Sequence, residues 1–245
     1  MPLDVTLVLV GLIILFASAI KITFGVGFAL IGTPLLLLVM EPDKVVGFIA
    51  PLILLQDLII LSQTWRHVPW RHAALLAVAA SVVAPFAAQL LTILDQRTLQ
   101  VTISSIIIVI GISLLAGLRL HIRRESTAMV AGGVVSGLVF PLSGISGPPV
   151  ALLLVNQQWP VQTMRAVLAA YLVALEVVTI TVFAVNGVVN AESLLSGLFM
   201  LPFLGLSIVL AAFALRRLKP EHYRRCVTLI VVCASLLGMV NLILS

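Results

Sequence analysis

The feature that most constrains this chain is a succession of apolar runs, each about as long as a bilayer is thick. Six of them contain about 20 residues, at 44–64, 73–94, 98–118, 161–186, 193–214 and 226–244. A helix of about 20 residues spans the roughly 30 Å hydrocarbon core of a membrane. Only 9% of the 245 residues are charged, against about 25% in soluble domains. The sequence therefore predicts an all-α polytopic membrane protein surrounded by the lipid bilayer.

Two stretches inside the apolar sequence contain residues that interrupt helices. The first, residues 21–34, reads KITFGVGFALIGTP, and the second, residues 140–149, reads FPLSGISGPP. In lipid, interrupted backbone is tolerated only where it is buried in protein or lines a polar cavity. The apolar run 147–158 after the second stretch would reach only about 18 Å as a helix, too short to cross alone. We therefore expect a broken or re-entrant helix pair at each stretch.

The basic residues are concentrated in three short loops, at 65–72, 119–125 and 216–225, which hold 10 of the 14 lysines and arginines. Such loops stay on the cytoplasmic side of a membrane. This pattern gives the orientation of a membrane protein rather than a groove for nucleic acid, so no nucleic-acid partner is expected. It places both termini outside the cytoplasm, with a bacterial inner membrane as the expected location.

The order of segments repeats along the chain. Each half consists of a broken pair followed by three spans, and Asp57 in the first half matches Glu176 in the second at an offset of 119 residues. Three crossings are an odd number, so the two halves insert in opposite orientations. We expect a single membrane domain, 1–245, built from two inverted-topology repeats, 1–122 and 123–245. Secondary transporters are built in this way, with the substrate site at the broken helices.

The broken stretches have the chemistry of an anion site. Glycines allow close approach of backbone to a ligand, and a short helix that starts at the break directs free N–H groups and a positive dipole end toward it. An intramembrane lysine is costly and marks a functional site by default, although Lys21 could also reach an interface. The alternative is that the breaks are kinks and packing contacts. The predicted substrate-binding residues are Lys21, Gly25, Gly27, Gly32, Thr33, Ser143, Gly144, Ser146 and Gly147.

Two carboxylates lie deep in their predicted spans, where each needs a partner or a proton. One hypothesis is that one of them couples transport to protons, and the other is hydrogen bonding between helices, to Lys21 or Arg165. Arg165 itself is interpreted as an interfacial anchor beside Trp159, with a cytoplasmic substrate contact as the alternative. The predicted coupling or structural network consists of Gln56, Asp57, Gln89 and Glu176.

No enzyme is expected, because no group of catalytic residues is recognisable. Gly25 and Gly27 lack the third glycine of a dinucleotide-binding motif, and no strand pattern precedes them. No cluster of cysteine and histidine has the spacing of metal ligands. Cys226 and Cys233 are expected to pack as small apolar residues. The sequence therefore predicts no cofactor and no metal.

The two glycine-rich stretches, residues 24–34 and 137–149, resemble the TauE/SafE sulfite exporter family. The size and the duplicated layout are similar across essentially the whole chain. Family members often carry a fuller glycine run, whereas here Phe28 and Ala29 follow Gly27, and Pro148 follows Gly147. The resemblance implies a transporter, usually an exporter, of sulfite or of an organosulfonate such as sulfoacetate. An anion channel, a non-transporting membrane scaffold and assembly into a homo-oligomer are left open.

Overall fold

The computed structural model describes residues 5–115, 125–145, 147–156 and 159–217. The described residues form helices and no strand, which confirms the prediction of an all-α protein. Four of these helical segments are long and apolar enough to cross a membrane, at Lys44–His67, Trp70–Ile93, Glu125–Ser143 and Val161–Val185. The elements are α1 (Val5–Phe24), α2 (Phe28–Leu36), α3 (Pro42–Thr64), the 3-10 helix η1 (Trp65–His67), α4 (Trp70–Ile93), α5 (Gln96–Leu115), α6 (Glu125–Ser143), α7 (Gly147–Asn156), α8 (Val161–Val185), α9 (Ala191–Phe199) and α10 (Leu201–Arg217).

Both predicted breaks are present, and the helices before them end in the same way. Helix α1 ends where Gly25 takes a φ of 80°, and α6 ends where Gly144 takes a φ of 72°. The amide of Gly25 donates to the carbonyl of Lys21 at 2.6 Å, and that of Gly144 donates to the carbonyl of Phe140 at 2.7 Å. This is the left-handed helix cap that favours glycine. Gly144 follows Gly25 by 119 residues, the same offset that separates Glu176 from Asp57.

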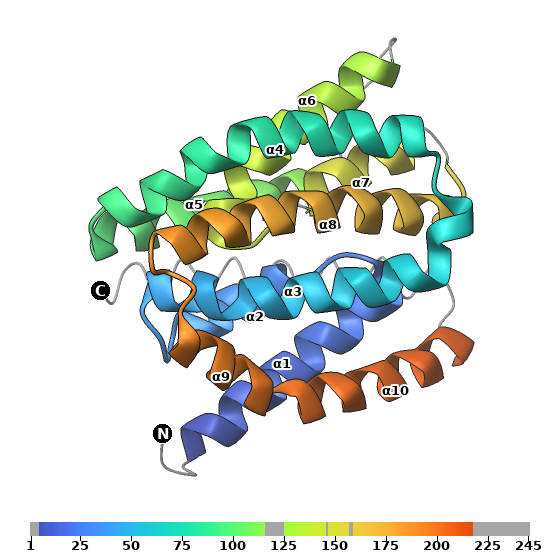
Figure 1. The fold of residues 1–245 in the computed structure, drawn as a ribbon. Helices are drawn as coiled ribbons and strands as arrows, with labels where there is room; N and C mark the ends of the chain where they lie inside the picture. The colour runs from blue at the N-terminus through green and yellow to red at the C-terminus, as the bar shows by residue number, and fades with distance from the viewer. Residues whose placement is uncertain (1–4, 116–124, 146, 157–158, 218–245) are drawn as a thin grey trace.

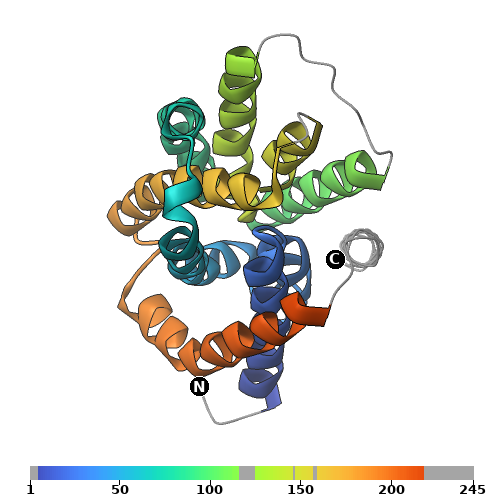
Figure 2. The ribbon, with the colours of Figure 1, turned by 90° about the vertical axis from the view of Figure 1, so that its right-hand side faces the viewer.

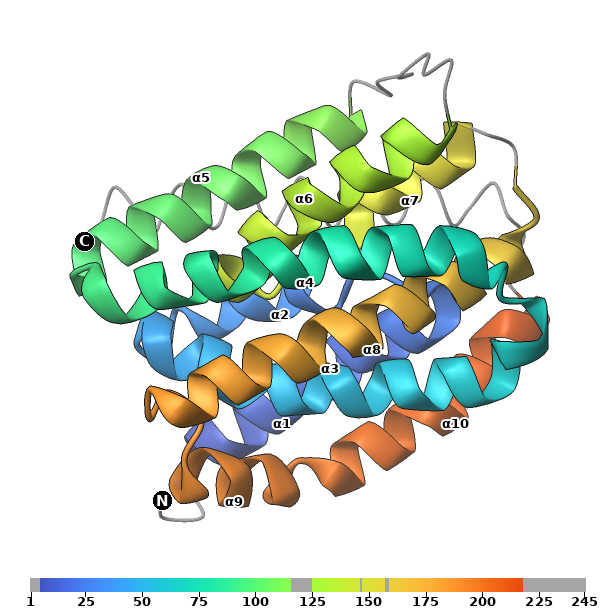
Figure 3. The ribbon, with the colours of Figure 1, turned by 45° about the horizontal axis from the view of Figure 1, so that its top comes forward.

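The two broken pairs enter the bundle from opposite ends. In Figures 1 and 3, α1 rises from the lower left and α6 descends from the upper right, and their breaks meet in the interior. Helices α3 and α8 run side by side through the middle, and α4 packs against both α6 and α8. Helices α9 and α10 lie along the lower side beside α3 and α1 (Figure 2). The interior that α3 and α8 share with the breaks is therefore the natural place for a site.

The expected single span at 193–214 is bent in the structure. Helices α9 and α10 meet at an angle of 46° around Met200. Pro202 lies in the first turn of α10, where its missing N–H group cannot continue the hydrogen bonds of α9. At the other end, α9 begins with a capping box in which Asn190 and Ser193 bond each other's backbone amides at 2.9 Å.

Close packing of α4 and α6 depends on two glycines of α6. A Cβ added to Gly133 would lie 2.6 Å from the carbonyl oxygen of Leu76, and one added to Gly137 would collide with the carbonyl oxygen of Ala80. Small residues at helix crossings let backbones approach closely, which is how helices associate in membranes. Helix α4 contributes alanines to the same interface, since Ala79 lies against Gly133 and the buried Ala80 against Gly137.

We predict that Gly137→Leu destabilises the protein by about 1–3 kcal/mol, the usual cost of forcing extra atoms into a packed interface. The matched control is Gly205→Leu in α10, because an added Cβ there meets no described atom within 4 Å. Thermal unfolding of the detergent-solubilised variants measures the difference. Equal unfolding temperatures for the two variants would show that the α4–α6 contact does not limit stability.

Candidate functional site

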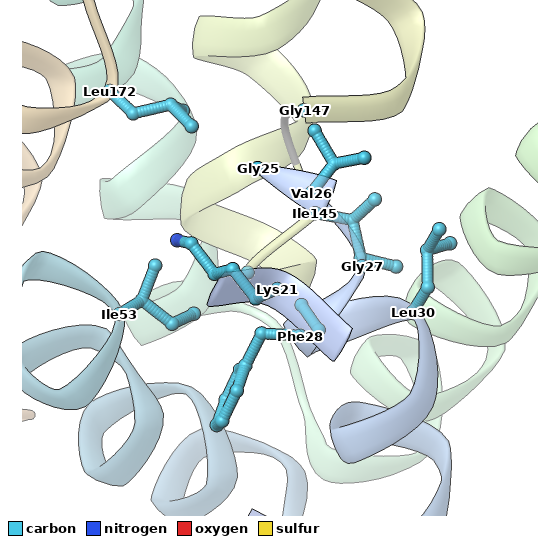
Figure 4. Close-up of a pocket in the computed structure, with 12 residues that line it drawn as sticks. Lys21, Gly25, Val26, Gly27, Phe28, Leu30, Ile53, Ile145, Gly147 and Leu172 are labelled. Carbon is cyan, nitrogen blue, oxygen red and sulfur yellow. The ribbon is translucent and has the colours of Figure 1, made fainter. Parts of the chain in front are cut away.

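A small cavity lies where the two breaks meet (Figure 4). It measures about 20 Å³, counted as the space open to the centre of a water molecule. Both breaks contribute to its wall, together with one residue each from α3 and α8. The lining residues are Lys21, Gly25, Val26, Gly27, Phe28, Ala29, Leu30, Ile53, Gly144, Ile145, Gly147 and Leu172.

The two breaks touch each other directly. A Cβ added to Gly147 would lie 2.5 Å from Val26, and one added to Gly144 would lie 3.3 Å from Ala29. The hydroxyl of Thr33 donates a hydrogen bond to the carbonyl of Ser143 at 3.0 Å, which joins α2 to the end of α6. Glycine at these positions therefore permits an approach that a side chain would prevent.

Two helix N-termini face this cavity. Helix α2 begins at Phe28 and α7 begins at Gly147, and both residues line the cavity. The first N–H groups of a helix have no partner within it, and the positive end of the helix dipole adds to their attraction for anions. Lys21 also lines this cavity, and its side chain supplies a formal positive charge at the same wall.

Lys21 forms a buried ion cluster with two carboxylates. Its ammonium nitrogen lies 2.6 Å from Oδ2 of Asp57 and 3.9 Å from Oε1 of Glu176. The lysine side chain is only 4% exposed, and both carboxylates are fully buried. Figure 4 shows the lysine side chain extending toward Ile53 of α3 and Leu172 of α8, about one helical turn before the two acids. Lys21 therefore belongs both to the cavity wall and to the carboxylate network.

Gln56 is buried, and its side-chain amide donates to the carbonyl of Leu52 at 3.0 Å within α3. Gln89 does not belong to the predicted network with Asp57 and Glu176, because it lies on the exposed face of α4 and outside the ion cluster. The buried face of α4 passes through Ala84, Ala88 and Leu91. A residue that follows Ala88 by one position is rotated by about 100° around the helix.

The predicted hydroxyl ligands bond to backbone. Ser143 donates to the carbonyl of Val139 at 2.9 Å and accepts from the amide of Ile145 at 3.2 Å, so it helps to shape the end of α6. Gly32 lies inside α2, where an added Cβ would be 3.6 Å from Ala17 of α1. Thr33 and Gly32 thus hold the elements of the site together, and neither lines the cavity. Ser146 lies outside the described residues.

Arg165 has a role that the sequence did not reveal. Its guanidinium donates to the carbonyl of Ile22 at 2.8 Å, and its Cγ lies 3.1 Å from a Cβ added to Gly25. The last carbonyls of a helix lack partners within it, and a cation there is favoured by the dipole. Arg165 of α8 thereby caps the broken end of α1. Its predicted neighbour Trp159 instead stacks edge-on against His72 at 5.1 Å between ring centres.

The fold and the cavity define a polytopic membrane protein with a buried polar site between broken helices, the general plan of a transporter. The sequence model of the family "Sulfite exporter TauE/SafE" matches residues 10–237. The chain therefore belongs to this family and is a sulfite exporter-type membrane transporter, as the sequence motifs predicted. No curated protein and no solved structure shows a significant similarity to the chain.

We predict that Lys21→Met destabilises the protein by about 3–5 kcal/mol, because it leaves buried carboxylates without their cation. The control is Lys44→Met, since Lys44 pairs with Glu41 on the surface with both side chains more than half exposed. Such an exposed pair contributes less than about 1 kcal/mol. Thermal unfolding in detergent compares the variants.

The double variant Lys21→Met with Asp57→Asn separates charge from packing. Removing one carboxylate together with the lysine should recover part of the lost stability, because fewer buried charges remain unpaired. If the double variant is less stable than Lys21→Met alone, the charges of the cluster do not determine its contribution to the stability of the protein.

Proposed function

We propose that the protein is a secondary transporter that carries a small sulfur-containing oxyanion, such as sulfite or a sulfonate, by alternating access around the cavity between the two breaks. The observation that carries this proposal is the convergence of two helix N-termini and Lys21 on one buried cavity. Membership of the sulfite exporter family supports the class of substrate. Export is the expected direction within that family.

The site suits an oxyanion for electrostatic reasons. A sulfite or sulfonate group has three oxygens, and the first N–H groups of α2 together with the N–H of Gly147 in α7 can bond to them at once. Pro148 and Pro149, the next residues of α7, have no N–H to contribute. The cavity wall otherwise consists of apolar side chains and glycines, so these donors act in a region of low dielectric constant. Gly25, Gly27, Gly144 and Gly147 would let the anion approach the backbone, while Lys21 would add charge.

The size of the cavity favours a carrier over an open channel. A volume of about 20 Å³ accommodates about one water molecule, which is less than the four heavy atoms of sulfite. Binding of the anion therefore requires the wall of the cavity to move outward. Such a change of conformation is a necessary part of transport by alternating access.

The two halves of the chain would supply this movement as inverted repeats. The matching caps at Gly25 and Gly144, and the matching acids Asp57 and Glu176, share one offset along the chain. The entry of α1 and α6 from opposite ends supports opposite directions for the two halves. Transporters with this symmetry exchange access by rocking one repeat or bundle against the other. Basic loops in the cytoplasm and termini outside it complete the proposed arrangement.

The first experiment tests for an anion site. Detergent-solubilised protein is heated with sulfite, ethanesulfonate, sulfoacetate, taurine, sulfate or chloride, and its unfolding temperature is measured. A bound anion at a concentration of about 100 times its Kd stabilises the folded state by about 2.7 kcal/mol. We expect sulfite or a sulfonate to raise the unfolding temperature more than chloride does. No shift with any anion would contradict the proposal.

We predict that Gly144→Ala reduces anion flux into proteoliposomes at least about tenfold, because the new Cβ would strain the left-handed cap and lie 2.8 Å from Ile49. Gly187→Ala is the matched control. Gly187 also has a positive φ of 74°, but it lies between α8 and α9 with no described atom within 4 Å of an added Cβ. Equal flux through the two variants would show that the break at Gly144 does not take part in anion transport. Accumulation against a gradient in the unmodified protein separates a carrier from a channel.

A further inference from the structure

The ion cluster beside the cavity contains one cation and two acids. Lys21 comes from α1, Asp57 from α3 and Glu176 from α8, and each side chain is at least 96% buried. With both acids ionised, the cluster would hold one uncompensated negative charge away from water. Such a charge costs several kcal/mol, and a buried acid avoids this cost by binding a proton.

The geometry identifies where a proton would sit. Asp57 Oδ2 receives the short contact from Lys21 at 2.6 Å, whereas Glu176 is 3.9 Å from the same nitrogen. The remaining oxygen of Asp57 and both oxygens of Glu176 accept no hydrogen bond from a described N–H or O–H group. A proton on Glu176 would turn it into a donor and allow it to bond to the neighbouring carboxylate of Asp57. The short contact leaves Asp57 as the ionised member of the pair.

No other described charge is placed to neutralise Glu176. Helix α7 has no charged residue, and Arg165 of α8 lies three turns away and bonds to the carbonyl of Ile22. The remaining charged or titratable residues on the helices that pack against α8 lie near its two ends. At its C-terminal end, Asp43 and Lys44 belong to the first turn of α3, close to the contact of Gly47 with Val188, and Lys44 pairs with Glu41 at the surface. The other side chains lie near its N-terminal end, where Ala166 packs against Val68 and Ala73. These side chains are Arg66 and His67 of η1 and Arg71 and His72 of α4.

We propose that Glu176, paired with Asp57, is a proton-binding site, and that proton binding there is linked to anion binding at Lys21. When Glu176 is protonated, the cluster is neutral and Lys21 can share its charge with an anion in the cavity. When Glu176 loses its proton, the cluster is negative and repels the anion. Anion and proton therefore bind and move together. This inference rests on the proposed anion transport.

The linkage has a consequence for the driving force. A monovalent anion that moves with one proton transfers no net charge across the membrane. The membrane potential, which acts on net charge, then neither drives nor opposes its transport. The concentration gradients of the anion and of the proton set the direction instead.

The test uses the full chain in detergent and ethanesulfonate as the probe, because this strong-acid anion stays ionised between pH 5 and 8. Isothermal titration calorimetry in two buffers with different ionisation enthalpies counts the protons taken up. Above the pH range in which Glu176 titrates in the free protein, we expect uptake of about one proton for each anion bound and a Kd that rises about tenfold per pH unit; below that range, where Glu176 already holds its proton, we expect neither. Glu176→Gln, which cannot ionise, should abolish proton uptake and make the Kd independent of pH.

Glu192→Gln is the matched control, because Glu192 is an exposed acid in the first turn of α9. It should keep the proton uptake of the unmodified protein. Anion binding with no proton uptake and no change of Kd at any pH between 5 and 8, or proton uptake that persists in Glu176→Gln, would overturn the inference and leave the proposed transport standing. If neither ethanesulfonate nor sulfite binds, the proposed transport fails.

A measurement without any anion tests the proton site separately. Infrared spectroscopy detects the carbonyl stretch of a protonated carboxyl group, and a pH-difference spectrum isolates the groups that titrate. We expect one buried carboxyl signal that disappears in Glu176→Gln and stays in Glu192→Gln. Identical spectra for the two variants would show that Glu176 holds no proton, whatever the result with anions.

Discussion

The structure depends on one buried interaction, the contact of the Lys21 ammonium with Asp57 and Glu176. It joins three helices, α1, α3 and α8, that are far apart in the sequence. The backbone of the same lysine completes the first break, because its carbonyl accepts the amide of Gly25 at 2.6 Å. The side chain thus fixes the charge of the site and the main chain fixes the end of the helix. Any movement of α1 relative to α3 and α8 must change the contacts of the ammonium group with the two carboxylates.

The breaks interrupt the backbone beside the cavity, and side chains of neighbouring helices bond to the carbonyls that the breaks leave without partners. Left-handed glycines end α1 and α6, and in both cases the next helix begins three residues later with its N-terminus at the cavity. Arg165 satisfies a carbonyl at the end of α1, and Thr33 satisfies one at the end of α6. Broken backbone inside a membrane needs such partners, since no lipid can supply them. Both bonds cross between helices, so they also tie the breaks to the surrounding bundle.

The sequence predicted the helical fold and the positions of both breaks, because glycine and proline act locally and long apolar runs are unambiguous. It also identified Lys21, Asp57 and Glu176 as costly residues that needed partners. It could not choose their pairing, which depends on how α1 is rotated against α3 and α8. For the same reason it placed Gln89 in the network, although the rotation of α4 turns that residue outward. The contact of Arg165 with Ile22 is equally a product of three-dimensional packing.

The two breaks share the same backbone cap but differ in charge. At the offset of 119 residues, the counterpart of Lys21 is Phe140, which is buried and whose carbonyl accepts the amide of Gly144 in the same kind of cap. In the ion cluster, α3 and α8 each contribute an acid, while only α1 contributes a cation. If the halves exchange conformations during transport, the lysine travels with the first break alone, and the two states cannot be electrostatic mirror images. A single cation shared by two acids leaves a place for one proton, and a second lysine in place of Phe140 would remove the need for it.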